Sequence, residues 1–221
     1  MFKKKNKEMV VKSKKVNKKK VLVFFEILIL VAIIAGIGVK VYFDFFKNPS
    51  DNPKEVITEK NAIKEYGYKL EDRDTDLFEG YFNNLEKVLE EKEIDYSKYA
   101  DLLTKLFISD FYTLSNKYTS TDIGGLDFIY PDSLENFKLN AGDTMYKTVK
   151  SNIDGTRQQT LPEVTDVVVE SCTETTFNYN EELPAYEVKA NWTYKEDLGY
   201  DTSKTLILMK KDDKLYVVSS K

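Results

Sequence analysis

The apolar residues divide the chain into three stretches with different spacing. Val21–Val39 is apolar throughout except for Glu26. Between residues 54 and 149, apolar residues recur every three or four positions, which is typical of helices that bury one face. Beyond residue 160 they alternate with polar residues, as in strands with one buried face. The pattern therefore predicts one long apolar helix, then several amphipathic helices, then strands.

The first stretch is long enough to cross a membrane. Its 19 residues would form a helix of roughly 28 Å, close to the thickness of the hydrocarbon core. Residues 1–20 contain ten lysines and one acid, Glu8, and lysines beside a first span hold that side in the cytoplasm. We expect a basic cytoplasmic tail (1–20), a transmembrane helix (21–43), a linker (44–53) and an extracytoplasmic domain (54–221) at the cell membrane. A cleavable signal peptide is the alternative, but the apolar run exceeds its usual length of about 7–15 residues.

Two features of the span are candidate contacts with other spans. Glu26 lies about 7.5 Å into it, where a charge is costly and marks a functional candidate. It could instead reach the cytoplasmic face, pair with a lysine of the tail, or be protonated. The small residues Ala32, Gly36 and Gly38 would permit close helix approach, although such patches also arise by chance.

Three or four helices are expected in the extracytoplasmic domain. Asp76 and Glu79 have the spacing of a capping box at a helix start, as do Asp132 and Glu135. Gly67 would end the first helical stretch, and Pro131 comes just before the last one. The expected helices are Lys54–Tyr66, Asp76–Glu93, Ser97–Asn116 and Asp132–Val149.

The strand-like part predicts an antiparallel meander. Asp212 and Asp213 separate two short apolar runs and predict a tight turn. Sequential strands with short links pair as neighbours, and helices segregated from strands define an α+β domain. The expected strands are Val164–Tyr179, Leu183–Tyr194, Thr205–Met209 and Leu215–Ser219.

Charge and composition argue against several function classes. Residues 47–221 contain 22 Lys and Arg against 34 Asp and Glu, a formal charge of −12, so they lack the basic surface of a nucleic-acid-binding domain. The chain has no histidine, which removes the common zinc sites and the Ser-His-acid arrangement. The single cysteine, Cys172, cannot form an internal disulfide. We therefore expect no enzymatic activity, no cofactor and no metal, and contact of the lysine tail with membrane lipid.

The layout resembles a known architecture. Helices packed in the concavity of a curved antiparallel sheet are typical of the nuclear transport factor 2-like superfamily, and Leu106–Leu114 (LFISDFYTL) looks like a helix of such a cone. A tail, one span and such a domain also resemble the bitopic scaffold proteins of bacterial type IV secretion and conjugation systems. Frequent Lys, Asn, Ile and Tyr are typical of an AT-rich genome, such as that of a low-GC Gram-positive bacterium. The resemblance to these scaffold proteins implies a non-catalytic assembly platform that self-associates and binds other envelope proteins.

Three sets of residues in the domain are candidate sites, each with a structural alternative. The first set would line a pocket of the cone for a small apolar or cell-wall-derived ligand, or else belong to the core; it comprises Phe107, Phe111, Tyr186, Trp192 and Tyr194. The loop 195–201 would contact a partner, or else be a solvated hairpin loop; its candidate residues are Asp197, Gly199 and Tyr200. The loop Asp122–Asp127, with two central glycines, would hold calcium or serve as a structural turn.

The sequence predicts a single-pass, membrane-anchored protein whose extracytoplasmic domain has three or four helices on a four-stranded antiparallel sheet. The resemblance implies that this domain is a nuclear transport factor 2-like cone and that the protein is a scaffold. An extracytoplasmic module that binds a small ligand is the alternative.

Overall fold

The computed structural model describes residues 57–221. The described residues belong to one compact unit, Asn52–Lys221. The expected tail and transmembrane helix, with Glu26, Ala32, Gly36 and Gly38, lie outside the described residues. None of the helices within residues 57–221 has both the length and the apolar character of a membrane span.

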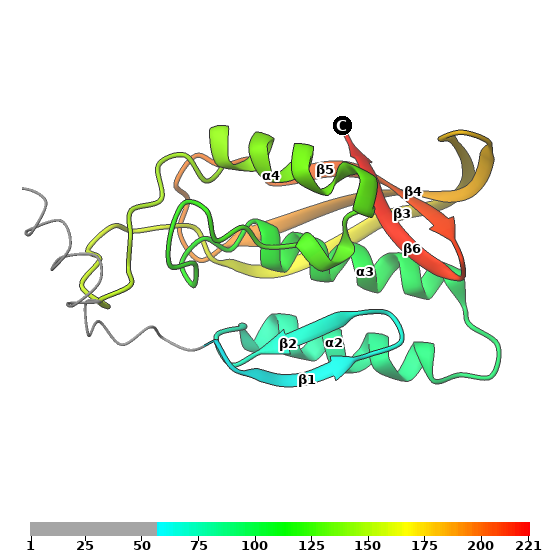
Figure 1. The fold of residues 1–221 in the computed structure, drawn as a ribbon, viewed down its shortest axis with the longest axis horizontal. Helices are drawn as coiled ribbons and strands as arrows, with labels where there is room; N and C mark the ends of the chain where they lie inside the picture. Colours follow the sequence, from blue (N-terminus) through cyan, green and yellow to red (C-terminus); the bar gives the residue numbers. More distant parts are fainter. Residues whose placement is uncertain (1–56) are drawn as a thin grey trace, which may run out of the picture. The chain divides into compact units, whose positions relative to one another are not determined.

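The described domain is α+β, as the sequence predicts, and its helices and main sheet are segregated along the chain (Figure 1). In chain order the elements are β1 (Glu59–Ile63), β2 (Tyr68–Glu71), α2 (Asp76–Leu89), α3 (Tyr96–Phe111), the 3-10 helices η2 (Leu126–Phe128) and η3 (Pro131–Ser133), α4 (Leu134–Asp143), β3 (Val164–Asn178), β4 (Glu182–Tyr194), β5 (Ser203–Lys211) and β6 (Lys214–Ser220).

The expected helix Lys54–Tyr66 is wrong, because its described part forms the strand β1, which pairs antiparallel with β2 in a hairpin. Gly67, at φ 68°, provides the left-handed conformation that turns the chain. Tyr68 and Leu70 are buried while Lys69 between them is exposed, which is the two-residue period of a strand. The few apolar residues before Gly67 could not define a helical face, so the buried tyrosine and leucine after it decide the local structure.

The helices α2, α3 and α4 confirm the other three expectations, with different ends. Thr75 caps α2, since its hydroxyl accepts a hydrogen bond from the amide of Phe78 at 3.2 Å. Asp132, expected at the start of the fourth helix, lies instead in η3. The third helix ends at Phe111 rather than Asn116, and the fourth at Asp143 rather than Val149. Beyond Gly142 the chain turns, and the amide of Tyr146 bonds to the carbonyl of Ala141 at 2.9 Å.

The main sheet is a four-stranded antiparallel meander in the order β3-β4-β5-β6. Asp212 and Asp213 both have positive φ, 49° and 62°, which confirms the tight turn between β5 and β6. The longest pairing joins β3 to β4, from Val164 opposite Tyr194 to Asn178 opposite Glu182. The meander makes β3 and β6 the two edges of the sheet.

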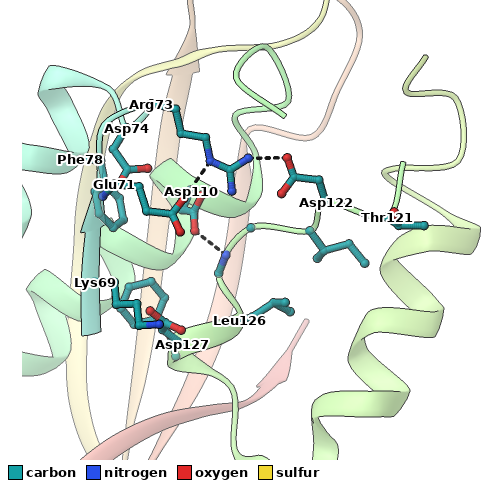
Figure 2. Close-up of a pocket in the computed structure, with 14 residues that line it drawn as sticks. Lys69, Glu71, Arg73, Asp74, Phe78, Asp110, Thr121, Asp122, Leu126 and Asp127 are labelled. Atoms are coloured by element: carbon teal, nitrogen blue, oxygen red, sulfur yellow. Dashed lines mark hydrogen bonds and ion pairs between the residues drawn. The ribbon is translucent and has the colours of Figure 1, made fainter. Parts of the chain in front are cut away.

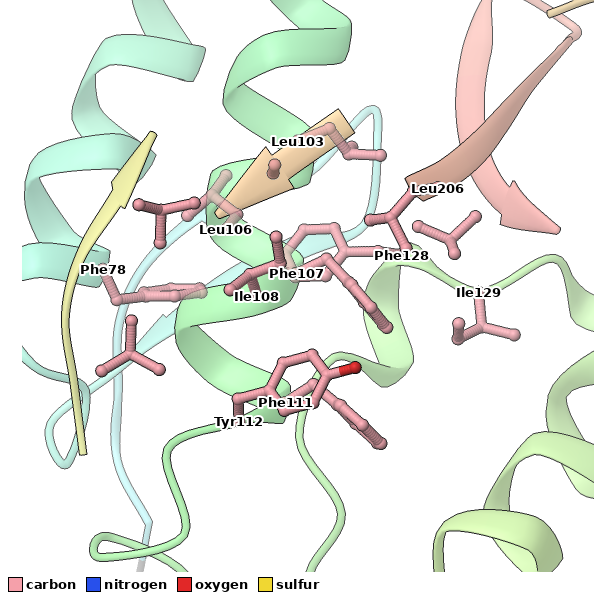
Figure 3. Packing of buried hydrophobic residues seen from close by; sticks show 14 of the residues in the cluster. Phe78, Leu103, Leu106, Phe107, Ile108, Phe111, Tyr112, Phe128, Ile129 and Leu206 are labelled. Carbon is pink, nitrogen blue, oxygen red and sulfur yellow. The ribbon is translucent and has the colours of Figure 1, made fainter. Parts of the chain in front are cut away.

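The core lies between α3 and the sheet. Side chains from α2, α3, η2 and β5 meet there, including Phe78, Leu106, Phe128 and Leu206 (Figure 3). The α3 helix is buried on more than one side, because it packs against α2 and against β3 and β4. This arrangement explains the broad apolar stripe of α3, which one amphipathic contact would not require.

Candidate functional site

The loop Asp122–Asp127 packs closely on the end of α3. The amide of Gly125 donates to the carboxylate of Asp110 at 2.6 Å, and the amide of Gly124 donates to the hydroxyl of Tyr146 at 3.0 Å. A Cβ at Gly124 would lie 2.5 Å from the carbonyl oxygen of Asp110. Gly125 adopts a φ of 75°, which favours glycine. Both glycines are therefore required for this loop to reach α3.

A cavity of about 240 Å³ lies between this loop, β2 and α3, and most of its polar wall is charged (Figure 2). Arg73 bridges two sides of it, because its guanidinium bonds to Glu71 at 2.8 Å and also to Asp122. The charged lining residues are Lys69, Glu71, Arg73, Asp74, Asp110, Asp122 and Asp127. The expected loop is thus one wall of a charged cluster that joins the hairpin β1–β2 to the helical layer.

Lys117, which is buried, and Asp110, which is partly buried, form an ion pair beside this cavity. The side chain of Lys117 is only 1% exposed, and its ammonium lies 2.5 Å from the Asp110 carboxylate. Burial alone would raise the pKa of Asp110, but the charge of Lys117 and its hydrogen bond hold that pKa below the ordinary value. The Asp110 carboxylate therefore stays ionised at neutral pH.

The pKa of Asp74 is shifted in the opposite direction to that of Asp110. Burial raises its pKa to about 6, even though its carboxylate accepts a hydrogen bond from the amide of Glu71 at 2.7 Å. A carboxyl with a raised pKa destabilises the folded state once it ionises. The penalty is absent below the ordinary value of 3.8, develops as the pH rises from there to about 6, and is complete above it.

We expect Asp74→Asn to stabilise the domain at pH 7.5 by about 1–2 kcal/mol, a value reduced because the carboxyl is partly exposed. The amide oxygen of asparagine can still accept the Glu71 hydrogen bond. Urea unfolding at pH 7.5 and 4.5 should show the gain shrinking in acid. Glu91→Gln, at an exposed position, is the matched control and should shift stability little at both pH values. A gain of Asp74→Asn that does not change with pH would contradict this assignment.

The calcium alternative for Asp122–Asp127 finds no support in the geometry. Asp122 is bonded to Arg73 and to the amide of Tyr118, and Asp127 lies apart on η2. Within residues 57–221, no group of three or more His, Cys, Asp and Glu side chains is placed to hold a metal ion. The arrangement instead locks a loop onto a helix through charge pairs and backbone hydrogen bonds.

A second, apolar site lies under α4. Phe137 of α4 separates a cavity of about 150 Å³, which Phe107 and Ile129 also line, from one of about 420 Å³, which Phe111 and Tyr112 also line. The Phe137 ring lies 6.1 Å from the Phe107 ring and 5.2 Å from the Phe111 ring. Ala141 is the one buried residue of α4. The helix therefore covers this groove mainly through Phe137.

The structure places only two of the five expected pocket residues at the groove under α4. Phe107 and Phe111 line the groove under α4. Trp192 is buried in the core with its ring 4.5 Å from that of Tyr112, and it lines neither cavity. Tyr186 and Tyr194, half-buried, pack against the edge of the core. The five residues therefore do not converge on one pocket.

The expected partner loop is exposed and ordered by local hydrogen bonds. Asp197 accepts a bond from the amide of Gly199 at 3.0 Å, and Gly199 has a φ of 75°. Tyr200 packs its ring 6.2 Å from that of Tyr194. Asp197 is free to meet a partner, whereas Tyr200 mainly fastens the loop to β4.

Sequence reasoning missed the charged cluster, and one signal for it exists. The chain has only two arginines, Arg73 and Arg157, and both bond inside the structure. Arg157 donates to the carbonyls of Lys117 and Ser115, each at 2.7 Å. Arginine is rare in this lysine-rich chain, so each arginine is a candidate for a role that lysine cannot fill. That role is the fork of hydrogen-bond donors on the guanidinium group. No spacing rule would have paired Lys117 with Asp110.

Comparison with protein-family models, with curated proteins and with solved structures finds no match.

Proposed function

We propose that the chain is a single-pass, membrane-anchored extracytoplasmic scaffold protein that acts through protein–protein contacts within an envelope machine of the secretion or conjugation kind. The apolar stretch 21–43 would anchor it with residues 1–20 in the cytoplasm. The described domain would then be the part that assembles with other copies and other envelope proteins.

The observation that supports this proposal is that one edge of the main sheet, β6, is covered by other residues, whereas most of the other edge, β3, is not. At β6, the tyrosine hydroxyls of Tyr68 and Tyr99 bond to the backbone of Leu215, and Ile129 forms a bridge with Val217. At β3, the bonds from outside the sheet lie near the start of the strand, where Thr113 accepts from the amide of Val164 and Tyr81 bonds to the backbone of Val167. Exposed edges bind other strands, and proteins normally protect them. The open edge of β3, in a domain that protects its other edge, is the contact surface of this proposal.

The placement of helices and sheet supports the finer fold proposal, a nuclear transport factor 2-like cone. Helix α3 packs along β3 and β4, and Phe107 and Phe111 of the LFISDFYTL stretch face the groove under α4. A helix inside a curved antiparallel sheet with a groove beside it is what this resemblance implies. The hairpin β1–β2, in place of a first helix, departs from that expectation.

In-cell cross-linking of the full-length protein, followed by mass spectrometry, tests the proposal. The expected result is capture of the protein itself together with a fixed set of envelope proteins. Recovery of the uncross-linked protein alone, at endogenous expression, would contradict it. A reporter fused at the C-terminus, active only outside the cytoplasm, tests the orientation independently.

The groove under α4 favours a second candidate, a module that binds a small apolar ligand. Its larger cavity, about 420 Å³, is within the range of ligand pockets, and phenylalanine rings line it beside a few polar groups. A ligand at 100 times its dissociation constant should stabilise the domain by about 2.7 kcal/mol. A thermal-shift screen with apolar and cell-wall-derived compounds would detect this, and Phe111→Asn should abolish a true hit. Leu139→Asn, on the exposed side of α4, is the matched control and should leave it unchanged.

A further inference from the structure

The edge strand β3 has a covered half and an open half. In the covered half, the amide of Val164 donates to the Thr113 hydroxyl at 3.1 Å, and the Tyr81 hydroxyl bonds to both backbone groups of Val167. Both irregularities of the β3–β4 register also lie there, at or before Ser171. Within the described part of the chain, no hydrogen bond from outside the sheet reaches the backbone of Cys172–Asn178. The open half is therefore seven residues long and regular.

The side chains of Cys172–Asn178 include one protective feature, the charge of Glu174. Charged side chains (lysine above all), proline and bulges are the usual devices that prevent strand pairing, and the sequence CTETTFN contains no lysine and no proline. Its register with β4 is unbroken from Cys172 opposite Val188 to Asn178 opposite Glu182. Five of its residues, Thr173–Thr176 and Asn178, are exposed, and threonine favours strands. The segment has the properties of an edge that accepts another strand.

We propose that Cys172–Asn178 pairs antiparallel with the same segment of a second copy, with the twofold axis at Thr175. This inference rests on the proposed scaffold function and names one of its contacts. Thr175 then lies opposite itself and Thr173 opposite Phe177. The pairing extends the sheet across two domains through backbone hydrogen bonds.

The Glu174 carboxylate favours the register with the axis at Thr175. Anchoring in the same membrane favours a second copy of the chain as the partner. An axis at Glu174 would oppose two carboxylates, which destabilises a strand pair. An axis at Thr175 places Glu174 opposite Thr176 and uses all seven open residues. A second copy supplies an open edge of the same length, and anchoring in one membrane raises the local concentration of such edges. Because seven residue pairs bury little area, the contact is weak in solution and depends on this concentration.

Disulfide trapping in the full-length protein in its membrane tests the register. Cys172→Ser first removes the native thiol, and Thr175→Cys then places one thiol on the axis. Directly opposed strand residues lie within the Cα separation of a disulfide. Thr173→Cys, on the same strand and equally exposed, is the matched control. Its two copies would lie four residues apart, roughly 13 Å, too far for a bond.

Mild oxidation should yield about tenfold more dimer from Thr175→Cys than from Thr173→Cys, since only the first pair meets disulfide geometry. Co-expressed Thr173→Cys and Phe177→Cys chains should cross-link to each other. No dimer from Thr175→Cys, or equal dimer from both positions, would overturn the pairing. Thr175→Cys linked only to a different protein would also overturn it, and would leave the scaffold function standing. Loss of every captured envelope protein in the cross-linking experiment would instead defeat the scaffold function itself.

Discussion

Replacing Lys117 with methionine is expected to lower the free energy of unfolding by about 3–5 kcal/mol. The substitution keeps much of the buried volume but leaves the carboxylate of Asp110 without the ammonium that lies 2.5 Å away. Burial would then raise the pKa of Asp110, so the loss should be smaller in acid than at pH 7.5. Urea unfolding of residues 52–221 measures the change.

The double variant Asp110→Asn/Lys117→Met is the control for this prediction. It removes both charges, so it should be more stable than Lys117→Met alone, because no buried charge is left unpaired. A single variant that loses less than about 1 kcal/mol would mean that the pair contributes as little as an exposed ion pair. The charged cluster would then not be what fastens the Asp122–Asp127 loop to α3.

The second large effect is expected at Trp192, where alanine should cost about 3–5 kcal/mol. The ring is 3% exposed and packs against Tyr112 in the core. Trp192→Phe retains an aromatic ring there and should lose clearly less. If Trp192 instead lined an open pocket, the alanine variant would be nearly as stable as the natural chain. Thermal unfolding of both variants distinguishes a core residue from a pocket residue.

The expectations from sequence were accurate where the apolar period was long. The alternation of Tyr186, Val188, Ala190, Trp192 and Tyr194 defines β4, and its buried members point to the core. The period of three and four in α2 and α3 located both helices within a few residues at their starts. These periods are decided by burial along one element, which sequence records directly.

The misses arise where distant residues decide the structure. The hairpin β1–β2 depends on Tyr68, whose hydroxyl meets that of Tyr99 and the backbone of Leu215. The charged cavity joins Arg73 to Asp122, 49 positions later. Neither contact produces a regular spacing of apolar residues in the nearby sequence that could have predicted it. The five pocket candidates do not line one described cavity, because alternation predicts which face of a strand is buried but not whether a cavity remains on it.

Site-specific photo-cross-linking in cells tests most directly the central claim, that the open edge of β3 is a contact surface of a membrane-anchored scaffold. A photoreactive residue at Thr175, in the full-length protein, should capture the same protein or an envelope partner. The same residue at Glu187, exposed on the interior strand β4, should capture much less. Capture at Thr175 above that at Glu187 is the predicted result. Equal capture at both positions, or none at Thr175, would contradict the account.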